Sequence, residues 1–493
     1  MKKIQFILVF ALTLAFTQSC NEDGLELTNP NALSPDTFFQ SEAQVQSSVN
    51  AIYANLQTRG LYARHMFFMM DNFAHENGGN TQLEADKLQY LNFSVDASHG
   101  ATRAYWESCY RGINKANFVI GNEEKINAIP DSQLSTERKA KFVGEAKFLR
   151  GLYYFFLVTR FGDVPLITVI QEDSSGFPRA PKADVWAQII TDLTDASNTL
   201  LAKGAEDSGR ATRGAAQALL GKTYLYLEQY ENALTAFNSL SGYDLETDFY
   251  DNFKEETEHG IESIFEVEYD DDLSDTAKWN SDASGVGPDE VTFRGQEYGF
   301  RDWYNVFPSD DLLNEYEAGD IRFEETFYVN GDIVESTGEV IDAFPSNNGG
   351  NAGWRKYQNY YKDANEDQAS GINMKVIRYA DVLLMMAEAE SMRPGGSQDV
   401  AAGYIDRVRE RAGLGSIGTE LSQSQLFDAL VHERKVELAG EQVRFNDIIR
   451  WGIAAQELSD TNFVEGIHEL SPIPNNEISS NEMITPADQN PGY

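Results

Sequence analysis

The residues best suited to chemistry are aromatic side chains set among polar, turn-forming neighbours between positions 243 and 375. Aromatic rings can stack on the apolar faces of sugar rings, while carboxylates, amides and arginines bond the sugar hydroxyls. Aromatic residues in such loops are easier for a ligand to reach than those on packed helices. We therefore predict ligand contacts by four side chains of this stretch: Trp279, Tyr298, Trp303 and Trp354.

A search for catalytic motifs finds none. The sequence contains no G-x-S-x-G, P-loop, G-x-G-x-x-G or H-E-x-x-H pattern. The six histidines are scattered singly, and neither His75-Glu76 nor His432-Glu433 is followed by a second histidine one helical turn on. With 78 Asp and Glu residues, a pair at the spacing used by glycosidases arises by chance. The sequence therefore predicts a protein that is not an enzyme.

One acidic stretch partly matches a calcium-binding loop. Asp363, Asn365 and Asp367 occupy its first three ligand positions. Gln368 stands where the sharp turn requires glycine, and Met374 where a bidentate glutamate belongs. We expect a solvated acidic loop there, with a calcium site as the alternative, and we expect no other metal or cofactor.

The overall charge excludes one class of partner. Asp and Glu number 78 against 39 Lys and Arg, which gives the 493-residue chain a formal net charge of -39. Such a surface repels phosphate, so sequence-independent binding to nucleic acid is excluded. Hydrophobic residues make up 42% of the chain, as in a folded protein, and two cysteines are too few for a disulfide scaffold.

The first 20 residues resemble the leader of a bacterial lipoprotein. A short basic start precedes an apolar run from Ile4 to Phe16, which is shorter than the roughly 20 residues of a membrane-spanning helix. We predict that residues 1–19 are a signal peptide and that Cys20 is the lipidated first residue of the mature protein. Ordinary cleavage, with Cys20 incidental, is the alternative. We expect the other cysteine, Cys109, to be a buried apolar residue on a helix.

Helical periodicity runs through most of the chain outside positions 243–375. Apolar residues recur every three or four positions, as at Val45, Val49 and Ile52. A helix is also predicted around Trp106, whose indole falls on the apolar face. The other predicted helices are 43–56, 142–161, 186–201, 215–227, 233–240, 376–392, 402–411 and 426–439.

One pair of these helices fits the tetratricopeptide repeat. The pattern L-G-x2-Y…A-x3-F is matched, apart from its tryptophan, by Leu220, Gly221, Tyr224, Ala233 and Phe237. Its small residues let two antiparallel helices approach, and its aromatic residues fill the space between them. Residues 387–389 and 401–411 suggest a second, more divergent pair. An ordinary antiparallel helix pair is the alternative interpretation.

The predicted architecture is a single, mainly α domain over residues 20–493. Its tetratricopeptide-like helical scaffold occupies about 30–242 and 376–493, and a loop-rich insertion carrying short strands occupies about 243–375. Gly, Asp, Asn and Ser punctuate the insertion, and alternating runs such as residues 264–269 suggest small strands.

Several collinear blocks resemble the SusD/RagB family. Together they cover the chain from about residue 30 to its last residue, and the lipoprotein-like start agrees with them. The acidic run after Cys20 is similar to the signal that sends lipoproteins to the outside of Bacteroidetes outer membranes. The blocks are Phe148–Phe155 with Arg160–Leu166, Arg378–Ala389, Glu433–Gly452 and Leu470–Tyr493.

Charged residues in the third block are predicted to be structural. Three glutamates recur every four residues on one helical face: Glu433, Glu437 and Glu441. Three arginines of the same block are available to neutralise them: Arg434, Arg444 and Arg450.

The resemblance implies a lipid-anchored, non-enzymatic binding protein on the cell surface, at the outer membrane. Such a protein captures an oligosaccharide or polysaccharide, delivers it to a SusC-like TonB-dependent transporter and closes over that barrel like a lid. In this family the loop before the Trp106 helix commonly contributes to the ligand site. That loop adds four candidates: Asp71, Asn72, His75 and Tyr90.

Three other functions stay open at this point. RagB-like members of the same family serve oligopeptide uptake, and no pattern in this sequence excludes a peptide ligand. A surface glycoside hydrolase would show turnover by the purified protein alone. A pure interaction scaffold built on tetratricopeptide repeats would bind a protein partner and no small ligand.

Overall fold

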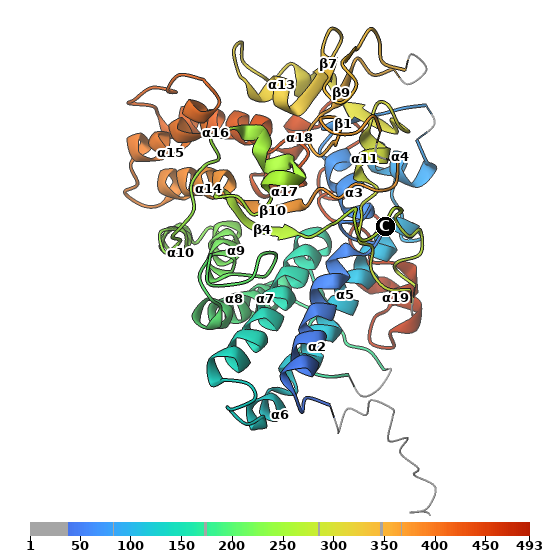
Figure 1. The fold of residues 1–493 in the computed structure, drawn as a ribbon, viewed down its shortest axis with the longest axis vertical. Coiled ribbons are helices and arrows are strands. Elements are labelled where there is room, and N and C mark those ends of the chain that lie inside the picture. The colour runs from blue at the N-terminus through green and yellow to red at the C-terminus, as the bar shows by residue number, and fades with distance from the viewer. Residues whose placement is uncertain (1–37, 82, 172–174, 284–285, 346–348, 366) are drawn as a thin grey trace, which may run out of the picture.

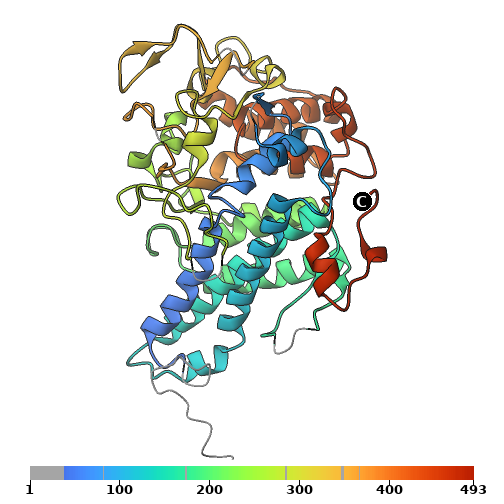
Figure 2. The ribbon, with the colours of Figure 1, turned by 90° about the vertical axis from the view of Figure 1, so that its right-hand side faces the viewer.

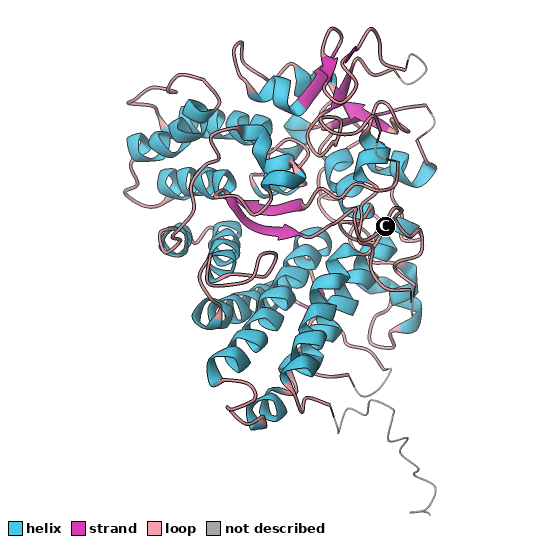
Figure 3. Ribbon diagram, in the orientation of Figure 1, coloured by secondary structure: helices cyan, strands magenta, loops and turns pink. Residues whose placement is uncertain are grey.

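The computed structural model describes residues 38–493, apart from residues 82, 172–174, 284–285, 346–348 and 366. The predicted signal peptide and Cys20 lie outside the described residues. Helices dominate, and the strands of the described part are short and pair in twos (Figure 3). The prediction of a mainly α fold is therefore confirmed. No helix in the described part is long and apolar enough to cross a membrane.

The N-terminal part of the scaffold is built from long antiparallel helices. Helices α2, α5 and α7 lie side by side in the lower half of the molecule (Figures 1 and 2). The elements of this part are α2 (Glu42–Ala54), η3 (Asn55–Gln57), α3 (His65–Phe73), β1 (Asn77–Gly79), α4 (Ala85–Leu91), α5 (Gly100–Ile120), α6 (Glu123–Ala128), α7 (Thr136–Phe161), β2 (Val164–Pro165), β3 (Arg179–Ala180), α8 (Lys182–Thr199), α9 (Arg213–Tyr226) and α10 (Tyr230–Phe237).

The C-terminal part of the scaffold packs against this first part through contacts of α14 with α9 and α10. It follows strand β10 (Met374–Arg378) directly. Its elements are α14 (Tyr379–Met392), α15 (Gln398–Arg411), α16 (Gln423–Glu437), α17 (Arg444–Arg450), α18 (Ala454–Glu457), α19 (Asn475–Ser480) and η6 (Pro486–Asp488).

The insertion consists of short elements joined by turns. Strand β4 near its start pairs antiparallel with β10 at its end, and Lys375 faces Glu266 across this ribbon. The two ends of the insertion are thus held together. The elements between them are η4 (Phe249–Phe253), η5 (Glu255–Thr257), β4 (Ser263–Val267), α11 (Arg294–Tyr298), β5 (Val306–Pro308), α12 (Asp310–Leu313), α13 (Arg322–Thr326), β6 (Phe327–Val329), β7 (Ile333–Val334), β8 (Glu339–Val340) and β9 (Ala352–Trp354).

Most predicted helices occur within a few residues of their expected bounds. The largest difference is at α7, which begins six residues before the predicted 142–161. In the helix predicted over residues 376–392, residues 376–378 belong to strand β10 and α14 begins at Tyr379. No glycine or proline marks this boundary in the sequence. Trp106 and Cys109 are both buried on α5, as predicted.

The tetratricopeptide-like pair is formed by α9 and α10. A Cβ atom on Gly221 would lie 2.4 Å from the ring of Phe237, so this glycine lets the two helices approach. Ala233 is fully buried between them. Helices α14 and α15 form the second predicted pair.

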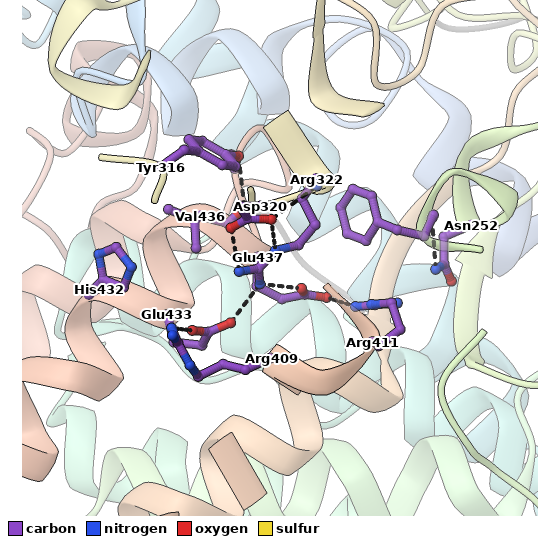
Figure 4. A network of polar contacts seen from close by, with 12 residues as sticks. Asn252, Tyr316, Asp320, Arg322, Arg409, Arg411, His432, Glu433, Val436 and Glu437 are labelled. Carbon is purple, nitrogen blue, oxygen red and sulfur yellow. Dashed lines mark hydrogen bonds and ion pairs between the residues drawn. The ribbon is translucent and has the colours of Figure 1, made fainter. Parts of the chain in front are cut away.

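Glu433 and Glu437 lie on α16 in a buried ionic network (Figure 4). The prediction of one helical face for all three glutamates was wrong, because α16 ends at Glu437 and Glu441 lies beyond it. The side chain of Arg322 is fully buried, and its Nη1 lies 2.6 Å from Glu433 and 2.8 Å from Glu437. Further cations reach these glutamates from β10 and α15: Arg378, Arg409 and Arg411. The predicted partners were wrong, because three arginines that are near in sequence pair with other carboxylates: Arg434, Arg444 and Arg450.

Candidate ligand-binding site

Two tryptophans from separate loops of the insertion stack on one another at the surface. The ring centroids of Trp279 and Trp303 lie 6.0 Å apart, and the angle between the ring planes is 21°. Trp279 is 38% exposed and Trp303 42% exposed, although most aromatic side chains of the described part are buried. We call Trp279 and Trp303 the tryptophan pair. Such a pair offers a flat apolar surface on which a sugar ring can stack.

Backbone hydrogen bonds fix both loops of the tryptophan pair. The backbone N–H of Trp303 donates to the carbonyl of Gln296 on α11 at 3.0 Å. Two residues before Trp279, the N–H of Ala277 donates to the carbonyl of Gln368 at 2.8 Å. The surface is therefore held by α11 on one side and by the far end of the insertion on the other.

Arg64, just before α3, packs against the ring of Trp279. Its guanidinium carbon lies 4.7 Å from the ring centre of Trp279, a cation–π contact. The ring of Phe293 lies 4.4 Å from that of Trp279. Arg64 also pairs with Glu84 at 3.0 Å and with the fully buried carboxylate of Glu297. These contacts fix the orientation of the Trp279 ring without using a ligand.

Polar groups flank the tryptophan pair in the sequence and at the surface. Lys278 and Asn280 are exposed on either side of Trp279, and Arg301 and Asp302 are half-buried next to Trp303. Amide, carboxylate and cationic side chains of this kind can bond sugar hydroxyls around a stacked ring.

Five other predicted ligand residues are buried. The structure places these side chains in the core: Asp71, Asn72, Tyr90, Tyr298 and Trp354. Three of them are brought together there by the amide of Asn77, which the sequence did not single out, and Asp71 joins them through Tyr298. Asn77 accepts from Trp354 Nε1 and donates to the Tyr298 hydroxyl and to Asn72 Oδ1, each at 2.9 Å. The Tyr298 hydroxyl in turn donates to Asp71 Oδ2 at 2.9 Å.

Two buried carboxyl groups, Asp71 in this network and Glu76 close to it in the sequence, hold their protons to a higher pH than usual. Burial raises the pKa of Asp71 to about 6 and that of Glu76 to about 8. Repulsion from Asp71 adds to the effect at Glu76. Both groups are buried, so they are not part of the exposed surface.

The contacts of His75 and Tyr90 are with residues other than the tryptophan pair. His75 is half-buried, its Nε2 lies 2.9 Å from the carbonyl oxygen of Leu91, and its ring stacks on Phe93. Burial lowers the pKa of His75. The hydroxyl of the fully buried Tyr90 lies 3.4 Å from Thr102 Oγ1. Neither residue joins the exposed aromatic surface.

The residues of the weak calcium candidate lie on an exposed turn of the insertion. Asp363, Asn365 and Asp367 are all exposed, and the backbone N–H of Asp367 donates to Asp302 Oδ1 at 3.2 Å. Within the described residues, the group of histidine and acidic side chains that comes together lies elsewhere, beside β4.

Two family profiles match the chain. One, described as the SusD family, matches residues 261–493. The other, described as "Starch-binding associating with outer membrane", matches residues 23–225. The chain belongs to the SusD/RagB family. Members of this family are non-catalytic binding proteins, so this SusD-like chain is not an enzyme.

Full-length relatives agree with this assignment. SusD-like protein P2 of Formosa agariphila is 29% identical and covers 100% of this chain and 99% of its own length. A SusD superfamily protein from Bacteroides vulgatus superposes with a TM-score of 0.79 at 26% identity, covering 93% of this chain and 100% of that one. A solved structure described as a laminarin binding SusD-like protein has a TM-score of 0.77 at 28% identity, covering 92% and 100%.

Proposed function

We propose that this SusD-like chain is a cell-surface glycan-binding lipoprotein. It captures an oligosaccharide on the tryptophan pair and delivers it to a SusC-like TonB-dependent transporter of the outer membrane. The observation that carries the proposal is the exposed, prearranged stack of Trp279 on Trp303. The likeness to a laminarin binding protein supports a glucan or another neutral glycan as the ligand class.

The setting of the pair supports sugar binding more than protein docking. The sequence neighbours of the two exposed rings are polar: Lys278, Asn280, Arg301 and Asp302. Carbohydrate sites combine a stacking surface with polar groups in this way. A rigid stack also costs little conformational entropy on binding, because both rings are already ordered.

The lipid anchor and the transporter complete the proposed cycle. Acyl chains on Cys20 would keep the receptor at the membrane, since each buried CH2 contributes about 0.8 kcal/mol. Tethering keeps receptor and barrel at high effective concentration. A bound glycan favours closure over the barrel only if it has greater affinity for the closed state than for the open one.

Native affinity gels test the glycan proposal. The chain from Asn21 to Tyr493 is run through gels cast with laminarin or other polysaccharides, and an acidic non-binding protein serves as the mobility reference. We expect one glycan to retard the wild type, and Trp279→Ala and Trp303→Ala each to weaken binding by about tenfold, or about 1.4 kcal/mol. Val400→Ala, which removes an exposed apolar side chain on the distant helix α15, should leave retardation unchanged (Figure 1).

Each outcome has a distinct meaning. Retardation that survives both tryptophan substitutions contradicts the tryptophan pair as the site. Retardation by no glycan, together with saturable binding of oligopeptides, replaces the glycan by a peptide ligand. Co-purification with a TonB-dependent barrel from native membranes tests the transporter partner separately from the ligand.

A further inference from the structure

Three potential metal ligands converge beside strand β4, away from the tryptophan pair. They are His259, Glu266 and Glu268, and one ligand atom from each lies within 4.8 Å of the other two. His259 Nε2 lies 3.2 Å from Glu268 Oε2. Among the described residues, this is the group of His, Cys, Asp and Glu side chains that meets this distance criterion.

The local backbone explains the convergence. Glu266 lies on β4 and Glu268 follows it two positions later, so both side chains leave the same face of the extended chain. His259 stands on the preceding turn with a positive φ of 59°, and its backbone N–H donates to Glu266 Oε1 at 3.1 Å, which holds this turn against the strand. Gly209, opposite, leaves room for the Glu268 carboxylate, because a Cβ there would lie 2.6 Å from its carboxyl carbon.

A neighbouring amide holds both carboxylates in place. Asn373 Nδ2 donates to Glu266 Oε2 at 3.1 Å and to Glu268 Oε1 at 3.3 Å. Partners of this kind orient the ligands of protein metal sites. The group is reachable, since the side chain of His259 is 29% exposed and that of Glu268 45% exposed.

A second observation favours a cation at this place. A hollow of about 200 Å³ lies between the loop around residue 206 and β4, and Glu206, His259 and Glu266 all line it. The side chain of Glu206 is only 3% exposed, and its Oε2 has no hydrogen-bond partner although Oε1 pairs with Lys141. A buried carboxylate oxygen without a partner is costly, and it adds negative charge at the hollow, whose lining also includes Lys203 and Arg210.

We propose that His259, Glu266 and Glu268 bind one divalent transition-metal ion, of which Zn2+ is the representative. Zinc accepts imidazole nitrogen and carboxylate oxygen as ligands, and three protein ligands leave the fourth position to water in the hollow. Calcium and magnesium prefer oxygen ligands alone, so the histidine selects against them. Lys375 pairs with Glu266 at 2.6 Å and competes with the metal, which makes the site one of moderate affinity.

The chain contains a matched control. His432 also contacts two carboxylates, with Nδ1 at 2.6 Å from Glu315 and Nε2 at 3.3 Å from Glu317. These glutamates lie at opposite edges of the imidazole ring, so the three ligand atoms do not surround one point. Lys435 also pairs with Glu315 at 2.9 Å. His432 therefore has the same residue types nearby without the geometry of a metal site.

Isothermal titration calorimetry with ZnCl2 tests the proposal. The protein from Asn21 to Tyr493 carries no affinity tag and is first dialysed against a chelator. We expect saturable binding of one ion per chain, weakened by at least about tenfold in Glu268→Gln and in His259→Asn, whose asparagine tolerates the positive φ. His432→Asn should bind like the wild type, and Lys375→Gln should bind more tightly because it removes the competing cation.

Thermal unfolding gives a second test, which does not depend on the heat of binding measured by calorimetry. Zn2+ should raise the melting temperature of the wild type and of His432→Asn, and should raise that of Glu268→Gln less or not at all. Absence of both saturable heat and a melting-temperature shift in the wild type overturns the proposal. Wild-type affinity retained in folded Glu268→Gln and His259→Asn overturns it as well, because the ion would then bind elsewhere.

Discussion

Arg64 lies beneath the ring of Trp279, with 4.7 Å between the guanidinium carbon and the ring centre, and pairs on its other side with the fully buried carboxylate of Glu297. One cation thus joins the exposed aromatic surface to the core. Glu297 sits on α11, which also fixes the backbone of Trp303 through Gln296. The two rings of the tryptophan pair are therefore positioned by the same short helix.

Removing the charge of Arg64 should destabilise the fold. In Arg64→Met, Glu297 keeps the amide of Asn305 but loses its cation while its side chain stays buried. Leaving a buried charge without its partner costs about 3–5 kcal/mol. We expect this loss in the free energy of unfolding measured in guanidinium chloride. Arg64→Met with Glu297→Gln should regain part of it, and a double variant as unstable as the single one would contradict the argument.

Two glycines on helices should respond in opposite directions to alanine substitution. Gly221→Ala places a methyl group 2.4 Å from the ring of Phe237 and should cost about 1–3 kcal/mol, as overpacking does. Gly403→Ala, on α15, meets no atom within 4 Å and should stabilise the protein by about 0.5–1 kcal/mol, the helix preference of alanine over glycine. Chemical denaturation of both variants measures the difference, and equal effects would show that packing of α9 on α10 is not limiting.

Stability should fall as the pH rises toward 8, because of Glu76. Its pKa is raised to about 8 in the folded protein from 4.5, so the folded state holds a proton that the unfolded chain has released. Between these two pKa values, retention of this proton by the folded state lowers the free energy of unfolding by about 1.4 kcal/mol for each unit by which the pH rises. Urea unfolding of the wild type and of Glu76→Gln between about pH 6.5 and pH 7.5 should differ by this slope. Parallel pH profiles would show that Glu76 is ionised in the fold.

Substitution of Cys20 should release the protein from membranes. Without the acyl chains, Cys20→Ser loses the proposed lipid anchor. Fractionation of the native cells should move the variant from the membrane pellet to the soluble fraction. Cys109→Ala, which changes the buried cysteine of α5, should stay with the membrane. A Cys20→Ser protein that remains in the pellet would mean that another contact holds it there.

The scaffold was predictable because helices show their buried face in the spacing of residues. Val45, Val49 and Ile52 are all fully buried on α2, as their periodicity indicates. The start of α14 was not predictable, since no glycine or proline separates it from β10. Pairing of β10 with β4 is a contact between positions more than one hundred residues apart, which no local pattern contains.

The candidate site was predictable in part. Trp279 and Trp303 were named from the sequence and are exposed, while Tyr298 and Trp354 were named on the same grounds and are buried. The difference comes from Asn77, whose amide binds both buried residues across more than two hundred positions. The immediate sequence neighbours of Trp279 give a weak indication that its side chain is exposed, because Lys278 and Asn280 are polar and both are exposed.

Two ionic contacts of the insertion lie on either side, in the sequence, of the two loops that carry the tryptophan pair. On one side Glu262 pairs with Arg378 at 2.6 Å, and on the other Arg322 pairs with Glu433 on α16. Both contacts lie outside the segment from residue 269 to residue 304. Inside that segment Glu297 pairs with Arg64, and Asp282 pairs with Arg59 at 3.2 Å. A new ligand specificity can therefore arise by exchange of its exposed residues, such as Trp279 and Trp303, while its buried residues keep the fold unchanged.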